Sequence, residues 1–208
     1  MATRPANCCK AADYSPRPYL SAISLTPHAI HMLLIRPSRP PDLAAVTAIY
    51  AQQVLHGTGT FETDPPKLAE MTVRRDDVLA KKLPYLVAED AGEIIGFAYC
   101  NWFKARPAYR YSAEDSIYLS PQAQRRGLGR ALLTELAARA EAVGVRKLIA
   151  VIGDSANAGS IGLHRSVGFT QVGVLTSCGW KFDRWLDVVL MEKVLGAGDH
   201  CPPPALGV

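Results

Sequence analysis

The turn at residues 124–130, QRRGLGR, combines two glycines with three arginines and joins a strand-like stretch, SIYLSP, to a helical stretch, ALLTELAARAEAV. The N-terminus of a helix is the positive end of its dipole, so arginines there are repelled unless an anion sits between them. Successive backbone N–H groups at the helix start would point at that anion. Gly127 and Gly129 would let the backbone approach it closely, because neither residue has a Cβ atom. Ion pairs could come from Arg125, Arg126 and Arg130, and the turn therefore predicts a bound pyrophosphate.

Two widespread phosphate-binding motifs do not fit this turn. The segment GLGRAL lacks the third glycine of the dinucleotide-binding fingerprint, and the acidic residue further on does not end the next strand. The P-loop is excluded because no GK[ST] follows the glycines. The pyrophosphate must therefore be held by a different strand–turn–helix motif.

The stretches on either side of the turn alternate between strand-like and helical patterns. In the predicted helix at 67–83 we expect Leu68, Met71, Val78 and Leu79 to face inward. The other predicted helices are 41–57, 127–143 and 155–167, and the predicted strands are 32–38, 85–90, 93–103, 115–121, 146–153, 169–177 and 185–195. The order β-α-α-β-β-β-α-β-α-β-β is that of a single mixed α+β domain and not of a doubly wound α/β fold.

The two ends of the chain differ from this domain in composition. Residues 1–31 contain scattered Pro, Ser and Arg without sustained periodicity, and they lack the apolar block of a secretory signal. We expect a disordered extension there, or an upstream start codon with Met32 beginning the folded chain. The domain is predicted to span 32–195. The tail at 196–208 offers no apolar face to bury and is expected to be disordered.

Composition narrows the classes of partner. The net charge of +4 suits anionic small molecules, but it is too weak and too scattered to indicate nucleic-acid binding. No apolar run reaches membrane-spanning length, and we expect a cytoplasmic protein. The cysteines form no CxxC pair, which argues against a zinc site and a disulfide scaffold. They are Cys8, Cys9, Cys100, Cys178 and Cys201.

The glycine turn resembles the Q/R-x-x-G-x-G/A signature of the GNAT N-acetyltransferases, written here from Gln124 to Gly129. Longer segments resemble the branch of phosphinothricin and methionine sulfone or sulfoximine N-acetyltransferases: YLVAEDAGEIIGFAYCNWFKARPAY, SAEDSIYLSPQAQRRGLG, IAVIGDSAN, GLHRSVGF and KFDRWLDVVLMEKVL. This ordered set covers about residues 33–195 and is more specific than the turn alone. The resemblance implies a central, mostly antiparallel twisted sheet with flanking helices, acetyl-CoA as the acetyl donor, and no metal.

The resemblance also implies which residues bind acetyl-CoA. The pyrophosphate would lie on Gln124, Arg125, Arg126, Gly127, Leu128, Gly129 and Arg130. The backbone of Ile117, Tyr118 and Leu119 would pair with pantetheine and offer an N–H to the thioester oxygen. Asn157 and Ser160 would contact pantetheine or cap the following helix, for which both residue types are ordinary choices.

Two residues are candidates for proton chemistry. An amine must lose a proton before it attacks a thioester, and its ordinary pKa of about 7.7–8.0 requires only a modest base. The resemblance gives this role to Glu114, directly or through water, whereas the residues alone also allow a solvated strand end beside Asp115. His164 lies where many GNAT enzymes carry a tyrosine that protonates the coenzyme A thiolate. With a thiol pKa of about 8.5 that step needs a weak acid or none, so acid, orienting and structural roles for His164 stay open.

The acceptor site is the least determined part of the sequence. The resemblance makes Phe61, Arg106 and Tyr109 substrate contacts. Phe61 lies where the branch has its first substrate loop, and Arg106 would supply the fixed cation that a zwitterion with a second anionic group needs. Taken alone, the segment from Lys104 reads as a solvated basic loop, and Phe61 as a loop aromatic packed on the core. The resemblance also implies a homodimer. The apolar WLDVVLM segment could serve as its interface and could equally be a buried strand.

We therefore expect an enzyme that acetylates the free amine of phosphinothricin, methionine sulfoximine or methionine sulfone by direct attack on acetyl-CoA. Proximity, a base and an oxyanion donor would suffice, without an acyl-enzyme. Two alternatives remain at this stage. One is acetylation of a polyamine or a protein N-terminus, and the other is a non-catalytic acetyl-CoA sensor.

Overall fold

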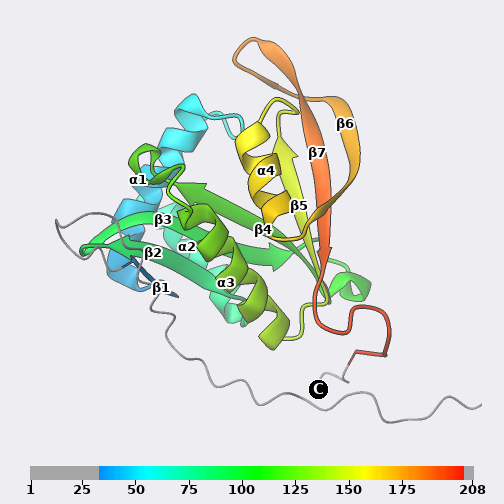
Figure 1. Cartoon of the computed structure of the whole chain (residues 1–208). Coiled ribbons are helices and arrows are strands. Elements are labelled where there is room, and N and C mark those ends of the chain that lie inside the picture. Colours follow the sequence, from blue (N-terminus) through cyan, green and yellow to red (C-terminus); the bar gives the residue numbers. More distant parts are fainter. Residues whose placement is uncertain (1–32, 204–208) are drawn as a thin grey trace, which may run out of the picture.

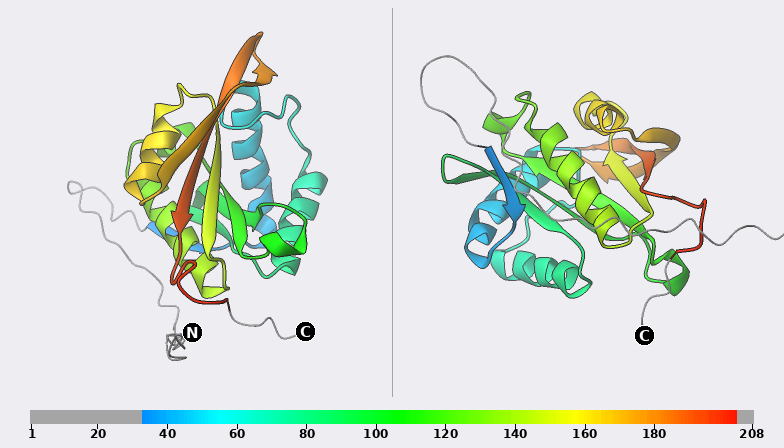
Figure 2. Two further views of the ribbon diagram at one scale, coloured as in Figure 1. Left: turned by 90° about the vertical axis from the view of Figure 1, so that its right-hand side faces the viewer. Right: turned by 60° about the horizontal axis from the view of Figure 1, so that its bottom comes forward.

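A seven-stranded sheet forms the middle layer of the computed structural model, which describes residues 33–203 (Figure 1). Helices α1 (Leu43–His56) and α2 (Leu68–Ala80) cover one face of the sheet, and α3 (Leu128–Ala142) and α4 (Ala158–Ser166) cover the other (Figure 2). The strands are β1 (Leu33–Pro37), β2 (Tyr85–Asp90), β3 (Glu93–Trp102), β4 (Ser112–Leu119), β5 (Lys147–Gly153), β6 (Thr170–Lys181) and β7 (Arg184–Val194). Short 3-10 turns occur at Pro40–Asp42, Pro107–Tyr109 and Pro121–Ala123. The predicted α+β order is confirmed.

The strand order is β1-β2-β3-β4-β5-β7-β6, and every neighbouring pair is antiparallel except β4 and β5. The parallel β4–β5 pairing is short. It runs from Ser112 opposite Lys147 to Asp115 opposite Ala150. Parallel neighbours need a long crossover, and α3 supplies it on the face shared with α4. The sheet is thus split beyond Asp115, and this split positions the candidate site.

Helix α2 faces the core with a different set of residues from the one predicted. Met71, Arg75 and Val78 are buried, whereas Leu68 and Leu79 are 48% and 39% exposed. The buried Arg75 guanidinium is satisfied by Ser38, donating from Nε to Oγ and from Nη2 to the carbonyl oxygen, each at 2.7 Å. The inward row therefore includes a paired cation, which a count of apolar residues misses.

Left-handed glycines end both helices of the second face. Gly144 after α3 and Gly168 after α4 each have φ of +93°, a conformation that residues with a Cβ rarely adopt. Each glycine directly follows the end of a helix predicted from the sequence, at 127–143 and at 155–167. The stop after α3 lets Lys147 begin β5 parallel to β4.

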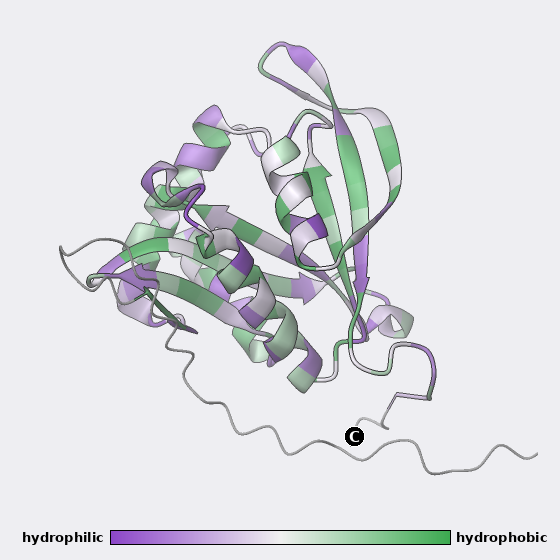
Figure 3. Cartoon of the chain, viewed as in Figure 1, coloured by the Kyte–Doolittle hydropathy of each residue, from purple (hydrophilic) through white to green (hydrophobic). Residues whose placement is uncertain are grey.

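The β6–β7 hairpin is longer than the sequence indicates. Strand β6 continues through Cys178 to Lys181, so the predicted end of this strand at residue 177 is wrong. A register shift between Leu175 and Gly179 lets the strand carry unpaired residues and still rejoin β7. In Figure 3 apolar residues continue along β5, β6 and β7. Most of the WLDVVLM segment is at least partly buried in β7, although Trp185 at its start is 62% exposed, and the homodimer stays a prediction.

Part of each end falls outside the described residues. The expectations for residues 1–31, including Cys8 and Cys9, and for 204–208 therefore stay predictions. Within the tail, residues 196–203 form turns, with the Gly198 N–H donating to the Leu195 carbonyl at 3.0 Å. None of the helices in residues 33–203 is long and apolar enough to cross a membrane.

Candidate active site

A cleft of about 720 Å³ opens where β4 and β5 separate. From Ser116 to Leu119, β4 is paired only with β3, and from Val151 to Gly153, β5 is paired only with β7. Both segments line the cleft. Volumes of this size are typical of small-molecule and cofactor sites. The split in the sheet therefore creates a binding site between two strand edges.

Most residues predicted from the sequence line this cleft. They are Phe61, Glu114, Ile117, Tyr118, Leu119, Gln124, Arg125, Gly127, Gly129, Arg130, Asn157, Ser160 and His164. The predicted residues that do not line it are Arg106, Tyr109, Arg126 and Leu128. Residues that line it and were not predicted include Tyr50, Gln53, Thr60, Tyr99, Asp115 and Ser116.

The glycine turn has the geometry of an anion site. Gly127 is the N-cap of α3 with φ of +77°, and a Cβ placed there would meet nothing within 4 Å. The first helical hydrogen bond joins the Ala131 N–H to the Gly127 carbonyl at 3.3 Å, so the N–H groups before Ala131 have no partner within the helix. Arg125 and Arg130 are exposed beside them. Free N–H groups at a helix start with arginines beside them are what an anion-binding site requires.

Two residues of the turn are directed elsewhere. The Arg126 side chain donates from Nη2 to Asp90 Oδ2 at 3.1 Å, at the end of β2, and does not line the cleft. Leu128 is buried in the core under α3. This geometry does not support the predicted contact of either side chain with the pyrophosphate, although their backbone belongs to the turn.

Glu114 lies on the wall of the cleft, opposite Asn101 of β3, and is half-buried. Burial raises the pKa of its carboxyl above the ordinary 4.5, the charge of Asp115 raises it further, and Lys104 opposes both effects. Within residues 33–203 the carboxylate takes part in no hydrogen bond or ion pair. It is thus available to accept a proton from a bound molecule.

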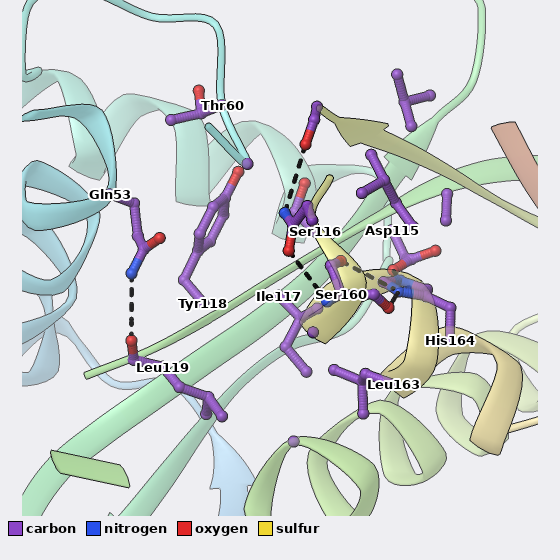
Figure 4. Close-up of a pocket in the computed structure, with 18 of the residues that line it drawn as sticks. Gln53, Thr60, Asp115, Ser116, Ile117, Tyr118, Leu119, Ser160, Leu163 and His164 are labelled. Carbon is purple, nitrogen blue, oxygen red and sulfur yellow. Dashed lines mark hydrogen bonds and ion pairs between the residues drawn. The ribbon is translucent and has the colours of Figure 1, made fainter. Parts of the chain in front are cut away.

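Asp115 and His164 form a buried pair across the split (Figure 4). His164 Nε2 lies 2.9 Å from Asp115 Oδ2, and the two side chains are 3% and 1% exposed. His164 Nδ1 lies 2.8 Å from the carbonyl oxygen of Ser160. Burial alone lowers the pKa of His164, but the hydrogen bond and charge of Asp115 outweigh it and the net shift is upward. Asp115 was not singled out from the sequence, although adjacent strand residues point to opposite faces and Glu114 faces the other side.

Asn157 and Ser160 both line the cleft, and Asn157 is also the capping residue of α4. Asn157 Oδ1 accepts a hydrogen bond from the Ser160 N–H at 3.1 Å, which is a regular N-cap of α4. Gln53 of α1 reaches across the cleft and donates to the Leu119 carbonyl at 3.4 Å. This long hydrogen bond connects α1 to the C-terminal end of β4. No sequence motif predicts it.

The loop that carries Phe61 is fixed by the distant β6–β7 hairpin. The buried Lys181 donates to the carbonyl oxygens of Gly57 and Thr60, each at 2.9 Å. The Phe61 ring lies against Gly153 of β5 and Gly179 of β6, and a Cβ at either glycine would overlap it. Phe61 is therefore both a packed aromatic and a part of the cleft wall.

The basic loop after β3 lies outside the cleft. Lys104, Arg106 and Tyr109 are exposed, and the Tyr109 ring packs edge-on against Phe103 at 5.9 Å. Lys104 is close enough to Glu114 to influence its carboxyl electrostatically. A role for Arg106 and Tyr109 in acceptor binding stays a prediction. Within residues 33–203 no group of three His, Cys, Asp or Glu side chains could hold a metal ion.

Comparison with known proteins gives one family. The family model described as "Acetyltransferase (GNAT) family" matches residues 47–169. The phosphinothricin N-acetyltransferase of Alcaligenes faecalis is 50% identical over 169 residues, which are 81% of this chain and 86% of that protein. The L-methionine sulfoximine/L-methionine sulfone acetyltransferase of Salmonella typhimurium is 36% identical over 180 residues, 83% of this chain and 99% of that protein.

The same relationship appears among solved structures. A GNAT superfamily phosphinothricin acetyltransferase from Sinorhizobium meliloti, solved in complex with AcCoA, matches with a TM-score of 0.81 and 44% identity. The match covers 83% of this chain and 94% of that one.

Proposed function

The chain belongs to the acetyltransferase (GNAT) family, and from this premise we propose that it acetylates the amino group of a small amino-acid analogue, with Glu114 as the general base. It is an acetyl-CoA-dependent N-acetyltransferase. The observation that carries the proposal is the position of β4 inside the split sheet. One face of this strand presents Glu114, and the other presents the residues that adjoin the glycine turn.

Alternation along β4 divides the cleft into two sides. Glu114, Ser116 and Tyr118 face α1, where the Tyr118 ring packs on Tyr50 with centroids 4.9 Å apart. We call this the acceptor side. Asp115, Ile117 and Leu119 face α3 and α4, and this is the donor side. Two molecules can thus approach the same strand from opposite faces.

Acetyl-CoA, when bound, supplies an activated acyl group, and the chain supplies position and proton transfer. The N–H groups at the start of α3, with Arg125 and Arg130, bind the pyrophosphate. The free edge of Ile117–Leu119 holds the pantetheine arm. Glu114 accepts the proton that the acceptor ammonium loses, so that the amine can form the N–C bond as the C–S bond breaks.

The charges on the acceptor side fit an amino acid better than a polyamine. Besides Glu114, this side has Glu62 behind Tyr50, where it accepts a hydrogen bond from Tyr50 Oη at 2.9 Å. Arg74 neutralises it with bonds of 2.6 and 3.2 Å from its two terminal nitrogens. A polyamine would need several unpaired carboxylates in this place. The names of the similar enzymes agree with an amino-acid analogue as acceptor.

The test is coenzyme A thiol release from acetyl-CoA with a panel of acceptors. It contains phosphinothricin, methionine sulfoximine, methionine sulfone, spermidine and a peptide with a free N-terminal alanine. We expect kcat/KM to be highest for one of the three amino-acid analogues. A preference for spermidine or the peptide would contradict the acceptor assignment. No turnover, with acetyl-CoA binding detected by calorimetry, would favour the sensor.

We also propose a homodimer that forms through β6, in place of the buried β7 segment. Strand β6 is the last strand of the sheet order and carries exposed Val172, Val174 and Leu175. An apolar edge strand of this kind is a ready surface for pairing with a second copy about a two-fold axis. Light scattering should give the mass of a dimer for the wild type and of a monomer for Val174→Lys. The exposed Val73 of α2 is the matched control, and a wild-type monomer at micromolar concentration would contradict the proposal.

A further inference from the structure

We infer that Asp115 is a positioning residue that holds His164 as an imidazolium on the donor side of the cleft. The catalytic part of this inference rests on the proposed function, because the charge would act on the sulfur that leaves. The charge itself can be tested without turnover.

Both ring nitrogens of His164 face oxygen atoms that accept hydrogen bonds. Nδ1 lies 2.8 Å from the Ser160 carbonyl, which cannot donate, and at the longer distance of 3.4 Å from the Ser160 hydroxyl, which can donate or accept. Nε2 lies 2.9 Å from Asp115 Oδ2, which also accepts when the carboxyl is ionised. A neutral imidazole has a single N–H. In one of these two contacts the lone pair of the ring nitrogen would then face the lone pair of the oxygen and repel it. Two N–H groups, and therefore an imidazolium, satisfy both.

The alternative is a neutral histidine beside a protonated Asp115, with the same proton on the carboxyl. Imidazole is the stronger base of the two in water, so the proton belongs on the ring. Asp115 Oδ1 is buried and has no hydrogen-bond partner within residues 33–203, so His164 is the one group that offsets the charge of the ionised carboxyl there. The negative charge of Asp115 therefore depends on a positive His164. An unpaired charge with this burial would be unstable.

The other neighbours of the pair do not replace either partner. Glu114 is the adjacent residue on β4, and the charge of Asp115 raises its pKa. Cys100 lies opposite Asp115 on β3, and burial followed by the same charge raises the pKa of its thiol, so it stays neutral. On the helix side the His164 ring meets the edge of Phe169 at 5.0 Å. The positive charge on His164 is thus set by Asp115.

A fixed imidazolium on the donor side has a direct use. When the C–S bond breaks, the electron pair stays on sulfur, and a preorganised positive charge stabilises the thiolate. Both ring protons remain in their hydrogen bonds, while the proton from the amine goes to Glu114. A thiol has an ordinary pKa of about 8.5, so the thiolate can leave without being protonated. His164 then acts by charge and not as the proton donor that the sequence allowed.

The substitution Asp115→Asn tests the inference with little change of shape. The asparagine amide can donate to Nε2, so a neutral His164 with its proton on Nδ1 satisfies every contact. Long-range 1H–15N spectra of the full chain, with His164→Gln to assign the signals, report the state of both nitrogens. We expect imidazolium-type nitrogens in the wild type at pH 7.5 and one pyridine-type nitrogen in Asp115→Asn. A pyridine-type nitrogen in the wild type would overturn the inference.

Kinetics test the role of the charge. Asp115→Asn should lower kcat on the order of 10–100-fold, with the KM values for acetyl-CoA and acceptor little changed. The exposed Asp76→Asn on α2 is the matched control. An Asp115→Asn enzyme with a neutral His164 and an unchanged kcat would overturn the positioning role. Because the spectra need no turnover, a wrong acceptor assignment and a wrong charge assignment give different results.

Discussion

The donor side and the acceptor side of the cleft are built from the chain in different ways. The donor side comes from one stretch of chain, β4 through α4, in which a strand, a glycine turn and a helix follow one another. The acceptor side joins α1 and the loop at Phe61 that follows it to the β6–β7 hairpin, which lies far along the sequence (Figure 1). Lys181 closes this side by bonding to carbonyl groups more than a hundred residues earlier. The contrast teaches that binding of the donor is a local property of the chain, whereas binding of the acceptor depends on tertiary packing.

The largest loss of activity is expected for a substitution of Glu114, the proposed base on the acceptor side. Glu114→Gln should lower kcat/KM for the amine by about 10²–10⁴-fold, as loss of a general base does. The pKa of Glu114 is raised above 4.5, so wild-type kcat/KM should fall as pH drops through that raised pKa, because the protonated carboxyl cannot accept a proton. In Glu114→Gln this acid limb should disappear and only the titration of the amine should remain. An unchanged pH–rate profile would exclude Glu114 as the base.

A substitution that perturbs the donor side should weaken the binding of acetyl-CoA and leave binding of the acceptor unchanged. Gly129 is enclosed by Leu163 and Leu119, and its Cβ would lie 3.1 Å from the Leu163 side chain. Gly129→Val should displace the N–H groups of the turn and raise the Kd of acetyl-CoA on the order of 10–100-fold, since hydrogen bonds to charged groups are the strong ones. Calorimetry measures this directly. Gly162→Ala on α4, where a Cβ meets nothing, is the control. A parallel rise in the acceptor KM would show that the two sides are not independent.

A substitution that perturbs the acceptor side should change the acceptor KM and leave the affinity for acetyl-CoA unchanged. Lys181→Met leaves the carbonyl groups of Gly57 and Thr60 without their donor, which should reduce the free energy of unfolding by about 1–3 kcal/mol. Because the loop at Phe61 is released, the acceptor KM should rise while the Kd of acetyl-CoA stays constant.

Lys193→Met is the matched control for this variant. Lys193 also donates to a backbone carbonyl, that of Val167, at 2.7 Å. Its loss should reduce stability without changing the acceptor KM. Equal effects of both lysine variants on the acceptor KM would mean that general destabilisation, and not the loop, is responsible.

The same contrast explains what could be predicted from the sequence. The element order and the glycine turn are encoded by residues close together, such as Gly127 at the cap and Gly144 at the stop, so they could be predicted. Asp115 was overlooked because its partner His164 belongs to another element, and only the fold brings them together. Arg75 was overlooked because a buried cation breaks the apolar pattern. The extension of β6 past Cys178 depends on a register shift against β7, which has no local signal.

The smallest change is expected for Arg126, which should differ from the other arginines of the turn in its effect on acetyl-CoA binding. Arg126 is partly exposed and bonds Asp90, whereas Arg125 and Arg130 line the cleft. Arg126→Ala should reduce the free energy of unfolding by no more than about 1 kcal/mol, as for other exposed ion pairs. Its Kd for acetyl-CoA should stay within about twofold of the wild type, whereas Arg130→Ala should lose a charge-assisted contact and bind more weakly by about tenfold. Binding measured at two salt concentrations sharpens the distinction, because only the loss at Arg130 should reduce the salt dependence. If Arg126→Ala weakens acetyl-CoA binding as much as Arg130→Ala does, its side chain must leave Asp90 for the pyrophosphate, and the donor side is then less preformed than its backbone indicates.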